Sequence, residues 1–365
     1  MQGVSWQERQ VMDSDSLILG IDGGGSHTRA WLGTLGLEPD GGMRIHRLGV
    51  GRSGGSNPRV EGMELACKNL MVAIEAAFQS ASLQRRPLDA VCMGLAGAGR
   101  PEEQRAVGAW VGRQQLAKRV EVCGDVELIL DAAGVEVGSD SDSFRLRPAD
   151  ALPRIAVLAG TGSNSFAATR LGERLNVGGW GPWIGDEGSG YSIACEGLRL
   201  ATQAVDQIGP PTGMVAAFNR HWGVTEPRDW ISKLYAMPRQ QVALLSALVF
   251  DQAARGDELA SRVIDQGAMA LARLARSLAS QLGCQQYHLL MAGGLLVGYD
   301  RYRQLLLKQL DQPGAIPLVI EEPVVGAMRR AGQMLAKEEG ERCLGKARLI
   351  FSAVESCSQA SPSGW

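Results

Sequence analysis

The sequence has no long apolar run and no excess of basic residues. Its apolar stretches fall short of the ~18 residues that a membrane span needs, and residues 1–15 are polar with acidic side chains. We therefore expect neither a membrane span nor a signal peptide, and we interpret residues 1–15 as a disordered terminus. The formal net charge is −2, which gives no support for a nucleic-acid or anionic-membrane partner.

Cysteine pairs are also lacking, since the seven cysteines are scattered without a C-x-x-C spacing. Most of them lie in apolar segments, which predicts reduced, buried thiols in a cytoplasmic protein. A zinc or iron–sulfur site within one chain is therefore not expected.

The 365 residues, 45% apolar and 21% charged, are enough for two globular domains of ordinary size. Apolar strands alternate with amphipathic helices, which predicts an α/β fold whose first sheet is largely parallel and extended at one side by an opening hairpin. We expect a first domain over residues 16–134, a surface insertion or linker over 135–153, a second domain over 154–337 and a tail over 338–365. The helices expected from apolar spacing cover residues 62–80, 101–118, 125–133, 191–205, 243–255, 257–282, 300–310 and 325–337.

The stretch Leu17–Arg29, LILGIDGGGSHTR, is an apolar run that ends in an acid and three glycines, and a second apolar segment, Ala30–Leu35, follows it. This pattern predicts a strand, a tight turn and a returning strand. Glycine has no Cβ, so the backbone of Gly23–Gly25 can adopt positive φ and bring its N–H groups close to a phosphate. Asp22, at the mouth of the turn, could hold a Mg²⁺ that neutralises the phosphates.

This turn matches neither common nucleotide signature. A P-loop carries Lys-Ser/Thr after its glycines and opens a helix, and the dinucleotide motif also leads into a helix, whereas a strand is expected here. An ordinary glycine-rich hairpin is the alternative. The strand Arg154–Gly160, the turn Thr161–Asn164 and the strand Ser165–Thr169 repeat the pattern in the second half. Two such hairpins predict a duplicated domain whose turns face each other across a cleft and hold a nucleotide between them.

A series of motifs extends this interpretation: DGGGSHT, GLAGAGRPEE, a strand followed by Gly-Asp and a helix, AGTGSN, GGWGPWIGDEGSGY, AGGLL and EPVVGA. Over Leu17–Lys337 their order resembles the N-acetylglucosamine kinase and glucosamine kinase group of the BadF/BadG/BcrA/BcrD ATPase family. The resemblance implies two ribonuclease-H-like domains with a central cleft, as in sugar kinases, heat-shock chaperone ATPases and actin. It also implies a homodimer that uses ATP and Mg²⁺ to phosphorylate the 6-hydroxyl of an amino sugar, N-acetylglucosamine or glucosamine.

The resemblance further implies roles for individual residues. Asp125 would take the proton of the sugar hydroxyl. The residues implied for ATP are Gly23, Gly24, Gly25, Ser26, Thr161, Gly162, Gly293, Gly294 and Gly326. The residues implied for the sugar are Asn57, Asp125, Ser163, Asn164, Gly179, Trp180, Gly181 and Asp186. Ser26 stands where family members usually have Thr, a departure that keeps the hydroxyl.

Other interpretations of these residues stay open. Asp125 could simply cap a helix, because Asp is favoured there. Asp131, expected in mid-helix and exposed, is the rival base. Core packing is the alternative for Trp180 and Trp183, and a plain helix N-terminus is the alternative for the glycine pair that starts at Gly293.

Two other functions also stay open. One is an ATPase that drives electron transfer, like the 2-hydroxyacyl-dehydratase and benzoyl-CoA reductase activators of the same broad family, although no cysteine follows the strand-turn signals where cluster ligands would lie. The other is an amino-sugar sensor without turnover, against which the presence of both Asp22 and Asp125 argues. The preferred sugar is open as well, since N-acetylmuramic acid would need room for a lactyl ether.

Overall fold

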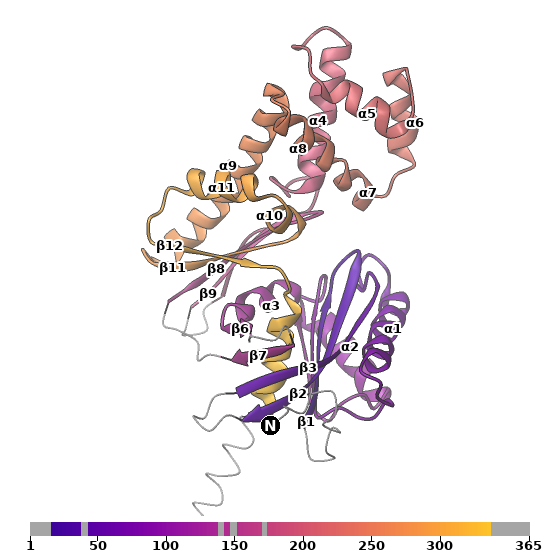
Figure 1. Ribbon diagram of the computed structural model, residues 1–365, viewed down its shortest axis with the longest axis vertical. Helices are drawn as coiled ribbons and strands as arrows, with labels where there is room; N and C mark the ends of the chain where they lie inside the picture. The colour runs from indigo at the N-terminus through magenta and orange to yellow at the C-terminus, as the bar shows by residue number, and fades with distance from the viewer. Residues whose placement is uncertain (1–15, 38–42, 138–141, 147–151, 170–173, 337–365) are drawn as a thin grey trace, which may run out of the picture. The chain divides into compact units, whose positions relative to one another are not determined.

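The computed structural model describes residues 16–37, 43–137, 142–146, 152–169 and 174–336 (Figure 1). The chain forms two compact units. Unit 1 takes the described residues of Met1–Asp131, Val135–Arg147 and Val324–Trp365, and unit 2 takes those of Ala132–Gly134 and Pro148–Pro323. The expected terminus 1–15 and the expected tail 338–365 lie outside the described residues.

Unit 1 is built on a sheet with the strand order β5-β4-β1-β2-β3-β7-β6. Its strands are β1 (Ser16–Gly23), β2 (His27–Leu37), β3 (Met43–Gly54), β4 (Ala90–Leu95), β5 (Val120–Gly124), β6 (Val135–Val137) and β7 (Ser143–Leu146). The predicted hairpin is confirmed, since β1 pairs antiparallel with β2 from Ser16–Leu35 to Gly23–Thr28. The expectation of a largely parallel sheet is wrong, because among the described strands of unit 1 only β1–β4 and β4–β5 pair in parallel. Connections as short as those of β1–β2–β3 allow only antiparallel neighbours.

The strands β6 and β7 fall in the stretch expected as an insertion or linker. They pair with each other, and β7 extends the sheet beside β3. Phe144 and Leu146, both buried, anchor β7 on the sheet. Their apolar alternation spans only a few residues among polar neighbours, so periodicity could not reveal it.

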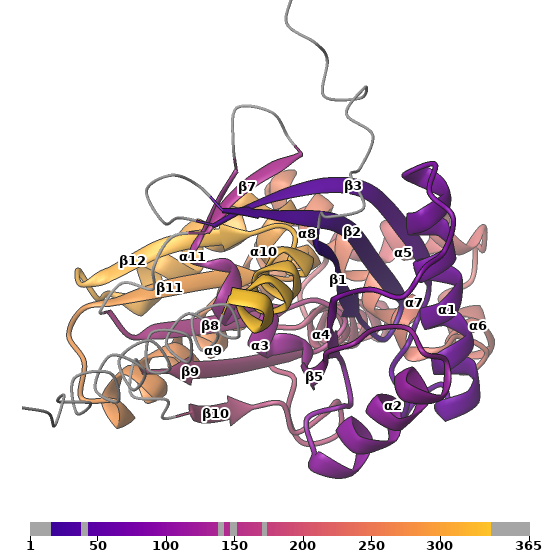
Figure 2. The ribbon, with the colours of Figure 1, turned by 90° about the horizontal axis from the view of Figure 1, so that it is seen from below.

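Two layers of helices cover this sheet (Figures 1 and 2). On one face, α1 (Met63–Ser80) and α2 (Pro101–Arg113) pack against alternate β1 residues, Leu17, Leu19 and Ile21. On the other face, Ile18 contributes to a core with α3 (Asp125–Ala132) and the helix over residues 324–336. Successive side chains of β1 thus point into the two cores in turn, as expected for a strand that is buried on both faces of its sheet.

Gly326 allows the helix over residues 324–336 to approach α3 closely. A Cβ at this position would lie 2.0 Å from the Leu128 carbonyl oxygen, which is backbone and cannot turn away. We expect Gly326→Ala to lower the free energy of unfolding by about 1–3 kcal/mol, the usual cost of overpacking. Gly332→Ala on the same helix is the control, because its Cβ would meet only side-chain ends, the nearest at 3.2 Å. Urea unfolding of both variants would test this, and equal midpoints would contradict it.

Unit 2 repeats the topology of unit 1. Its sheet has the order β10-β9-β8-β11-β12, which corresponds to β3-β2-β1-β4-β5: antiparallel pairs on one side of the first strand and parallel pairs on the other. The strands are β8 (Arg154–Ala159), β9 (Ser163–Ala168), β10 (Arg174–Gly178), β11 (Tyr287–Ala292) and β12 (Ala315–Ile320). The duplicated hairpin predicted from sequence is therefore confirmed.

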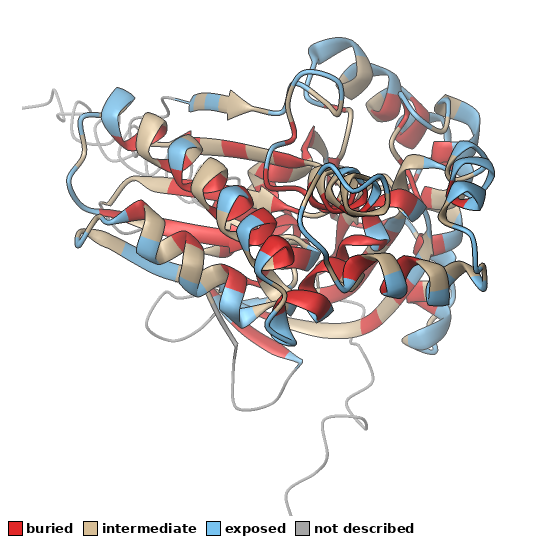
Figure 3. Cartoon of the chain, turned by 90° about the horizontal axis from the view of Figure 1, so that it is seen from above, coloured by how far each residue is buried: buried red, intermediate tan, exposed pale blue. Residues whose placement is uncertain are grey.

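The helices of unit 2 form its core with the sheet. They are α4 (Gly190–Val205), α5 (Met214–Trp222), the 3₁₀ turn η2 (Pro227–Asp229), α6 (Trp230–Tyr235), α7 (Arg239–Leu244), α8 (Ser246–Ala254), α9 (Glu258–Gln281), α10 (Gly294–Gly298) and α11 (Asp300–Leu310). Buried and exposed residues alternate along the helices, as Figure 3 shows, in the pattern of amphipathic helices. None of the helices within the described ranges combines the length and apolarity of a membrane span.

Candidate active site

The parallel strands of unit 1 end level with one another. Gly23 of β1 lies opposite Leu95 of β4, and Leu95 lies opposite Gly124 of β5. The glycine turn follows β1, and Asp125 follows β5 as the first residue of α3. Ligands of open α/β sheets bind outside the carboxyl ends of parallel strands. One edge of unit 1 thus gathers the predicted phosphate loop and the predicted base.

The glycine turn is shaped by close packing. None of Gly23, Gly24 and Gly25 has a φ in the left-handed region, so the expected positive φ is wrong. A Cβ on Gly23 would lie 2.2 Å from Ser56 Oγ, whereas one on Gly25 would meet nothing within 4 Å. The Gly24 N–H donates to the His27 carbonyl at 2.8 Å and closes the turn. Gly23 is therefore required by the fold, and Gly25 borders open space.

Asp22 and Ser26 flank this turn, and both are half-buried. The described residues contain no group of three or more His, Cys, Asp or Glu side chains that could hold a metal. A Mg²⁺ at Asp22 would therefore rest on at most two carboxylates, with phosphate oxygens and water as its other ligands. That arrangement suits Mg²⁺, which keeps several waters and binds through one or two carboxylates plus substrate phosphates.

Asn57 lies against the turn that follows β4. Its Oδ1 accepts a hydrogen bond from the Arg59 N–H at 3.0 Å. A Cβ on Gly97 would come within 2.2 Å of the same oxygen, and Gly97 has a left-handed φ of 80°. The structure therefore brings the predicted sugar residue to the same edge of unit 1 as the glycine turn.

Asp125 is half-buried at the start of α3. Burial raises the pKa of its carboxyl above the usual range, and hydrogen bonds from the backbone N–H groups of Val126 and of Asp125 itself oppose this rise. A carboxylate with a raised pKa is a stronger proton acceptor, which suits a general base. Asp125 is itself the first residue of α3, and Gly124 stands at the cap position before it, so the interpretation of Asp125 as only a helix cap has no support.

Asp131 is not the exposed mid-helix residue that the sequence predicted. It lies at the end of α3, and its carboxylate pairs with Arg330 from the helix over residues 324–336. The Arg329 guanidinium donates to its backbone carbonyl at 3.0 Å. An ion-paired carboxylate at the far end of α3 from Asp125 is a poor candidate for the base.

The second glycine turn joins β8 to β9 in unit 2. Thr161 and Gly162 are half-buried in it. The Gly160 N–H donates to the Gly162 carbonyl at 2.9 Å, and the Gly190 N–H at the start of α4 donates to the Gly160 carbonyl at 2.8 Å. The turn is therefore held against the first turn of α4, whose Ser189 cap accepts from the Ser192 N–H.

The buried carboxylate of Asp186 forms an ion pair with Arg239, a partly exposed residue that sequence reasoning missed. This carboxylate also accepts from the Ser163 N–H at 3.2 Å. A Cβ on Gly162 would lie 3.0 Å from both side chains, so the pair lies directly beside the second glycine turn. The Arg239 guanidinium also lies 5.5 Å from the centre of the Tyr191 ring. Arg239 stands in a segment without periodicity, and no sequence signal connected it to Asp186.

The loop after β10 carries the next predicted sugar residues. Gly179 and Gly181 have left-handed φ values of 72° and 86°, and a Cβ on Gly179 would lie 2.6 Å from Asn164 Nδ2. Trp180 is 73% exposed and Trp183 is 92% exposed. Core packing, the alternative for both tryptophans, is therefore wrong, and their ring faces are accessible.

The remaining glycines fall in different units. Gly293 has a left-handed φ of 90°, and its Cβ would lie 2.5 Å from the Ala159 carbonyl oxygen, while Gly294 borders open space. Both follow β11 at the carboxyl end of the parallel strands of unit 2. Gly326 belongs to unit 1, where it packs on α3. The binding roles of these glycines stay predictions.

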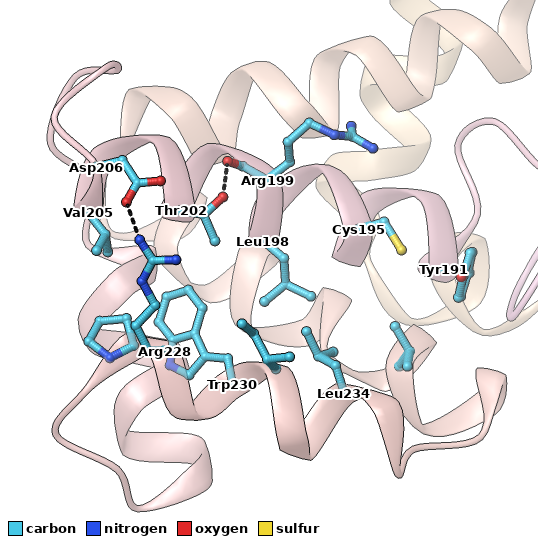
Figure 4. A pocket seen from close by; sticks show the side chains of 13 residues that line it. Tyr191, Cys195, Leu198, Arg199, Thr202, Val205, Asp206, Arg228, Trp230 and Leu234 are labelled. Carbon is cyan, nitrogen blue, oxygen red and sulfur yellow. Dashed lines mark hydrogen bonds and ion pairs between the residues drawn. The ribbon is translucent and has the colours of Figure 1, made fainter.

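A separate cavity of about 410 Å³ lies between α4 and α6 (Figure 4). Its lining is largely apolar, with Leu198, Trp230 and Leu234 among its walls, and the Arg228–Asp206 ion pair of 3.2 Å at one end. None of the predicted site residues lines it. This apolar cavity is therefore distinct from the predicted site.

Comparison with known proteins decides the family. A model of the BadF/BadG/BcrA/BcrD ATPase family matches residues 19–329, most of the chain. The chain belongs to this family. N-acetyl-D-glucosamine kinase of Dictyostelium discoideum is 27% identical over 81% of this chain and 91% of the relative. N-acetylmuramic acid/N-acetylglucosamine kinase of Clostridium acetobutylicum is 26% identical over 79% of this chain and 90% of the relative.

A solved structure also resembles this member of the BadF/BadG/BcrA/BcrD family. It comes from Chromobacterium violaceum and is provisionally assigned as an N-acetylglucosamine kinase. Its sequence is 25% identical to this chain, and the two structures superpose with a TM-score of 0.66. The match covers 86% of this chain and 98% of the solved chain. Together with the strand order shared by the two units, this confirms the predicted fold of two ribonuclease-H-like domains. The family match contains every predicted site residue, from Asp22 to Gly326.

Proposed function

We propose that the protein is an ATP-dependent kinase that phosphorylates the 6-hydroxyl of an amino sugar, N-acetylglucosamine or glucosamine. The two curated relatives are amino-sugar kinases, and each aligns with about four fifths of the chain. The observation that carries the proposal is the common edge of β1, β4 and β5. There a glycine turn next to open space and a half-buried Asp125 follow strands that end in register.

In the proposed reaction, Asp125 accepts the proton of the 6-hydroxyl as the sugar oxygen attacks the γ-phosphorus of ATP. The bond from that phosphorus to the β–γ bridging oxygen breaks, and ADP leaves. The backbone of the glycine turn after β1 orients the phosphates, and positioning of this kind supplies most of the catalysis in phosphoryl transfer. Mg²⁺, when bound at Asp22, would neutralise charge on the phosphate oxygens.

The proposal assigns the sugar to polar side chains and one exposed ring. Asn57, Asn164 and Asp186 offer hydrogen bonds to sugar hydroxyl or acetamido groups. Trp180 offers an exposed ring to a sugar face. The Ser163 hydroxyl donates to the Glu187 carbonyl at 2.8 Å, so its proposed role is to hold the loop that carries Asp186.

A panel of amino sugars and plain hexoses, incubated with ATP and read by mass spectrometry, tests the proposal. We expect a gain of one phosphate on N-acetylglucosamine or glucosamine and none on the 6-deoxy analogue. ATP turnover without any phosphorylated sugar, together with iron in the purified protein, would favour the electron-transfer activator instead. Each of the five described cysteines, Cys67, Cys92, Cys123, Cys195 and Cys284, is buried or half-buried, which does not favour a cluster shared between subunits. Tight sugar binding without ADP release would favour a sensor.

A further inference from the structure

Arg330 is held by three carboxylates. Its Nη1 lies 2.6 Å from Glu121 Oε1, its Nη2 lies 3.0 Å from Glu127 Oε2, and its Nε pairs with Asp131. The Arg330 side chain is only 11% exposed. The planar guanidinium therefore binds three carboxylates, one on β5 and two on α3, through three different N–H groups. Arg330 itself comes about 200 residues later in the chain than these partners.

Glu127 connects this ion-pair cluster to the start of α3. Its second oxygen, Oε1, accepts a hydrogen bond from the Gly124 N–H at 3.3 Å. Gly124 directly precedes α3, and Glu127 is the third residue of the helix, so this contact is the glutamate half of a capping box. Asp125, the predicted base, lies between Gly124 and Glu127 as the first residue of α3.

We propose that Arg330 is a positioning residue for Asp125. It fixes the rotamer of Glu127, Glu127 holds the Gly124 N–H, and the first turn of α3 then presents the Asp125 carboxylate in one geometry. This inference rests on the proposed function, because it concerns the base of that reaction. A small displacement of such a group is costly, since misplacement by about 1 Å can lower a rate about 10²-fold.

A purely structural role predicts something different. If Arg330 only ties the last helix to the rest of unit 1, then the loss of any one carboxylate partner affects stability and activity alike. If Arg330 acts through Glu127, the loss of Glu127 slows the chemical step because Glu127 contacts Gly124. The loss of Glu121 then leaves the chemical step unchanged. Glu121 pairs with the same guanidinium but lies in β5, so Glu121→Gln is the matched control.

The test compares Arg330→Lys, Glu127→Gln and Glu121→Gln in steady-state kinetics with the sugar and ATP. We expect the first two variants to lose about tenfold or more in kcat with KM for both substrates within about twofold, the sign of an interaction that acts in the transition state. Glu121→Gln should keep kcat within about twofold. The double variant Arg330→Lys/Glu127→Gln should lose no more than the worse single variant, because both changes break one pathway.

Hydrogen exchange of the backbone amides of residues 124–126 gives a readout without activity. We expect faster exchange there in Arg330→Lys and Glu127→Gln and unchanged exchange in Glu121→Gln. Equal loss of kcat in all three variants, additive loss in the double variant, or unchanged exchange at residue 124 would overturn the proposal. If the wild type phosphorylates no sugar, the proposed function fails, and exchange at residues 124–126 still decides whether Arg330 orders the start of α3.

Discussion

Asp125→Asn is expected to lower kcat by about 10²- to 10⁴-fold, the usual contribution of a general base. Asn keeps the size of the side chain and can still bind a hydroxyl, but it cannot take the proton. The dissociation constant for ATP should stay near that of the wild type, because the phosphate turns are untouched. Steady-state kinetics together with calorimetric ATP titration would test this. A kcat within a few-fold of the wild type would contradict the role of Asp125 as the base.

The raised pKa of Asp125 gives the same variant a second signature. When a carboxyl has a higher pKa in the folded than in the unfolded state, it ionises less readily in the fold. The folded protein therefore loses stability as the pH rises from the unfolded-state pKa through the folded-state pKa. Asp125→Asn removes that cost, so its thermal midpoint at neutral pH should be equal to or above that of the wild type. In the wild type, kcat/KM should fall on the acid side at a pH above the range of an ordinary aspartate. A destabilised variant would contradict this interpretation of the burial.

Gly25→Val is expected to raise the dissociation constant for ATP by about 10- to 100-fold. A Cβ on Gly25 meets nothing within 4 Å, so the isopropyl group enters the space that the proposed phosphates occupy and leaves the packing of unit 1 intact. The steric cost of overpacking, about 1–3 kcal/mol, corresponds to this loss of affinity. Calorimetry with a non-hydrolysable ATP analogue would measure it, and sugar affinity should stay within a few-fold.

Gly23→Ala is the control for this experiment. Its Cβ would lie 2.2 Å from Ser56 Oγ and 2.5 Å from Leu95 Cδ2, so it should lower the thermal midpoint and weaken both ligands through the fold. If Gly25→Val also lowers the thermal midpoint and both affinities, the turn is structural only. The ordinary glycine-rich hairpin would then be the correct interpretation.

The elements with long apolar periods could be predicted from sequence. The helix expected over 62–80 is α1, the one over 257–282 is α9, and the one over 300–310 is α11, each within one residue of its bounds. Shorter elements were missed, among them β10 and α10, because a few residues carry no periodic signal. The helix expected over 101–118 ends at Arg113, and Gln115 has a left-handed φ of 49°. A helix end followed by a left-handed glutamine could not be predicted, because glutamine is not a residue that marks such a conformation in the sequence.

The candidate site divides in the same way. Glycine turns and an acid after a strand are local patterns, so the two turns and Asp125 could be located by reading along the chain. The partners of those residues could not, because they are tertiary. Arg239 reaches Asp186 across 53 residues, and Arg330 reaches Glu127 across 203. Ion pairs of this kind depend on which helix faces which, and a single sequence does not carry that information.

The division of unit 1 between the two ends of the chain has a consequence for synthesis on the ribosome. Ile18, Trp31 and Ile45 share a core with Val324 and other residues of the helix over residues 324–336. Arg329 follows its partner Asp131 by 198 residues, which take about 10–40 s to translate at roughly 5–20 residues per second. Unit 2 lies almost entirely between them, so it can complete its core first, although it comes second in the sequence. During that interval the nascent unit 1 exposes one apolar face of its sheet, and we expect chaperones to bind there until the helix over residues 324–336 has left the ribosome.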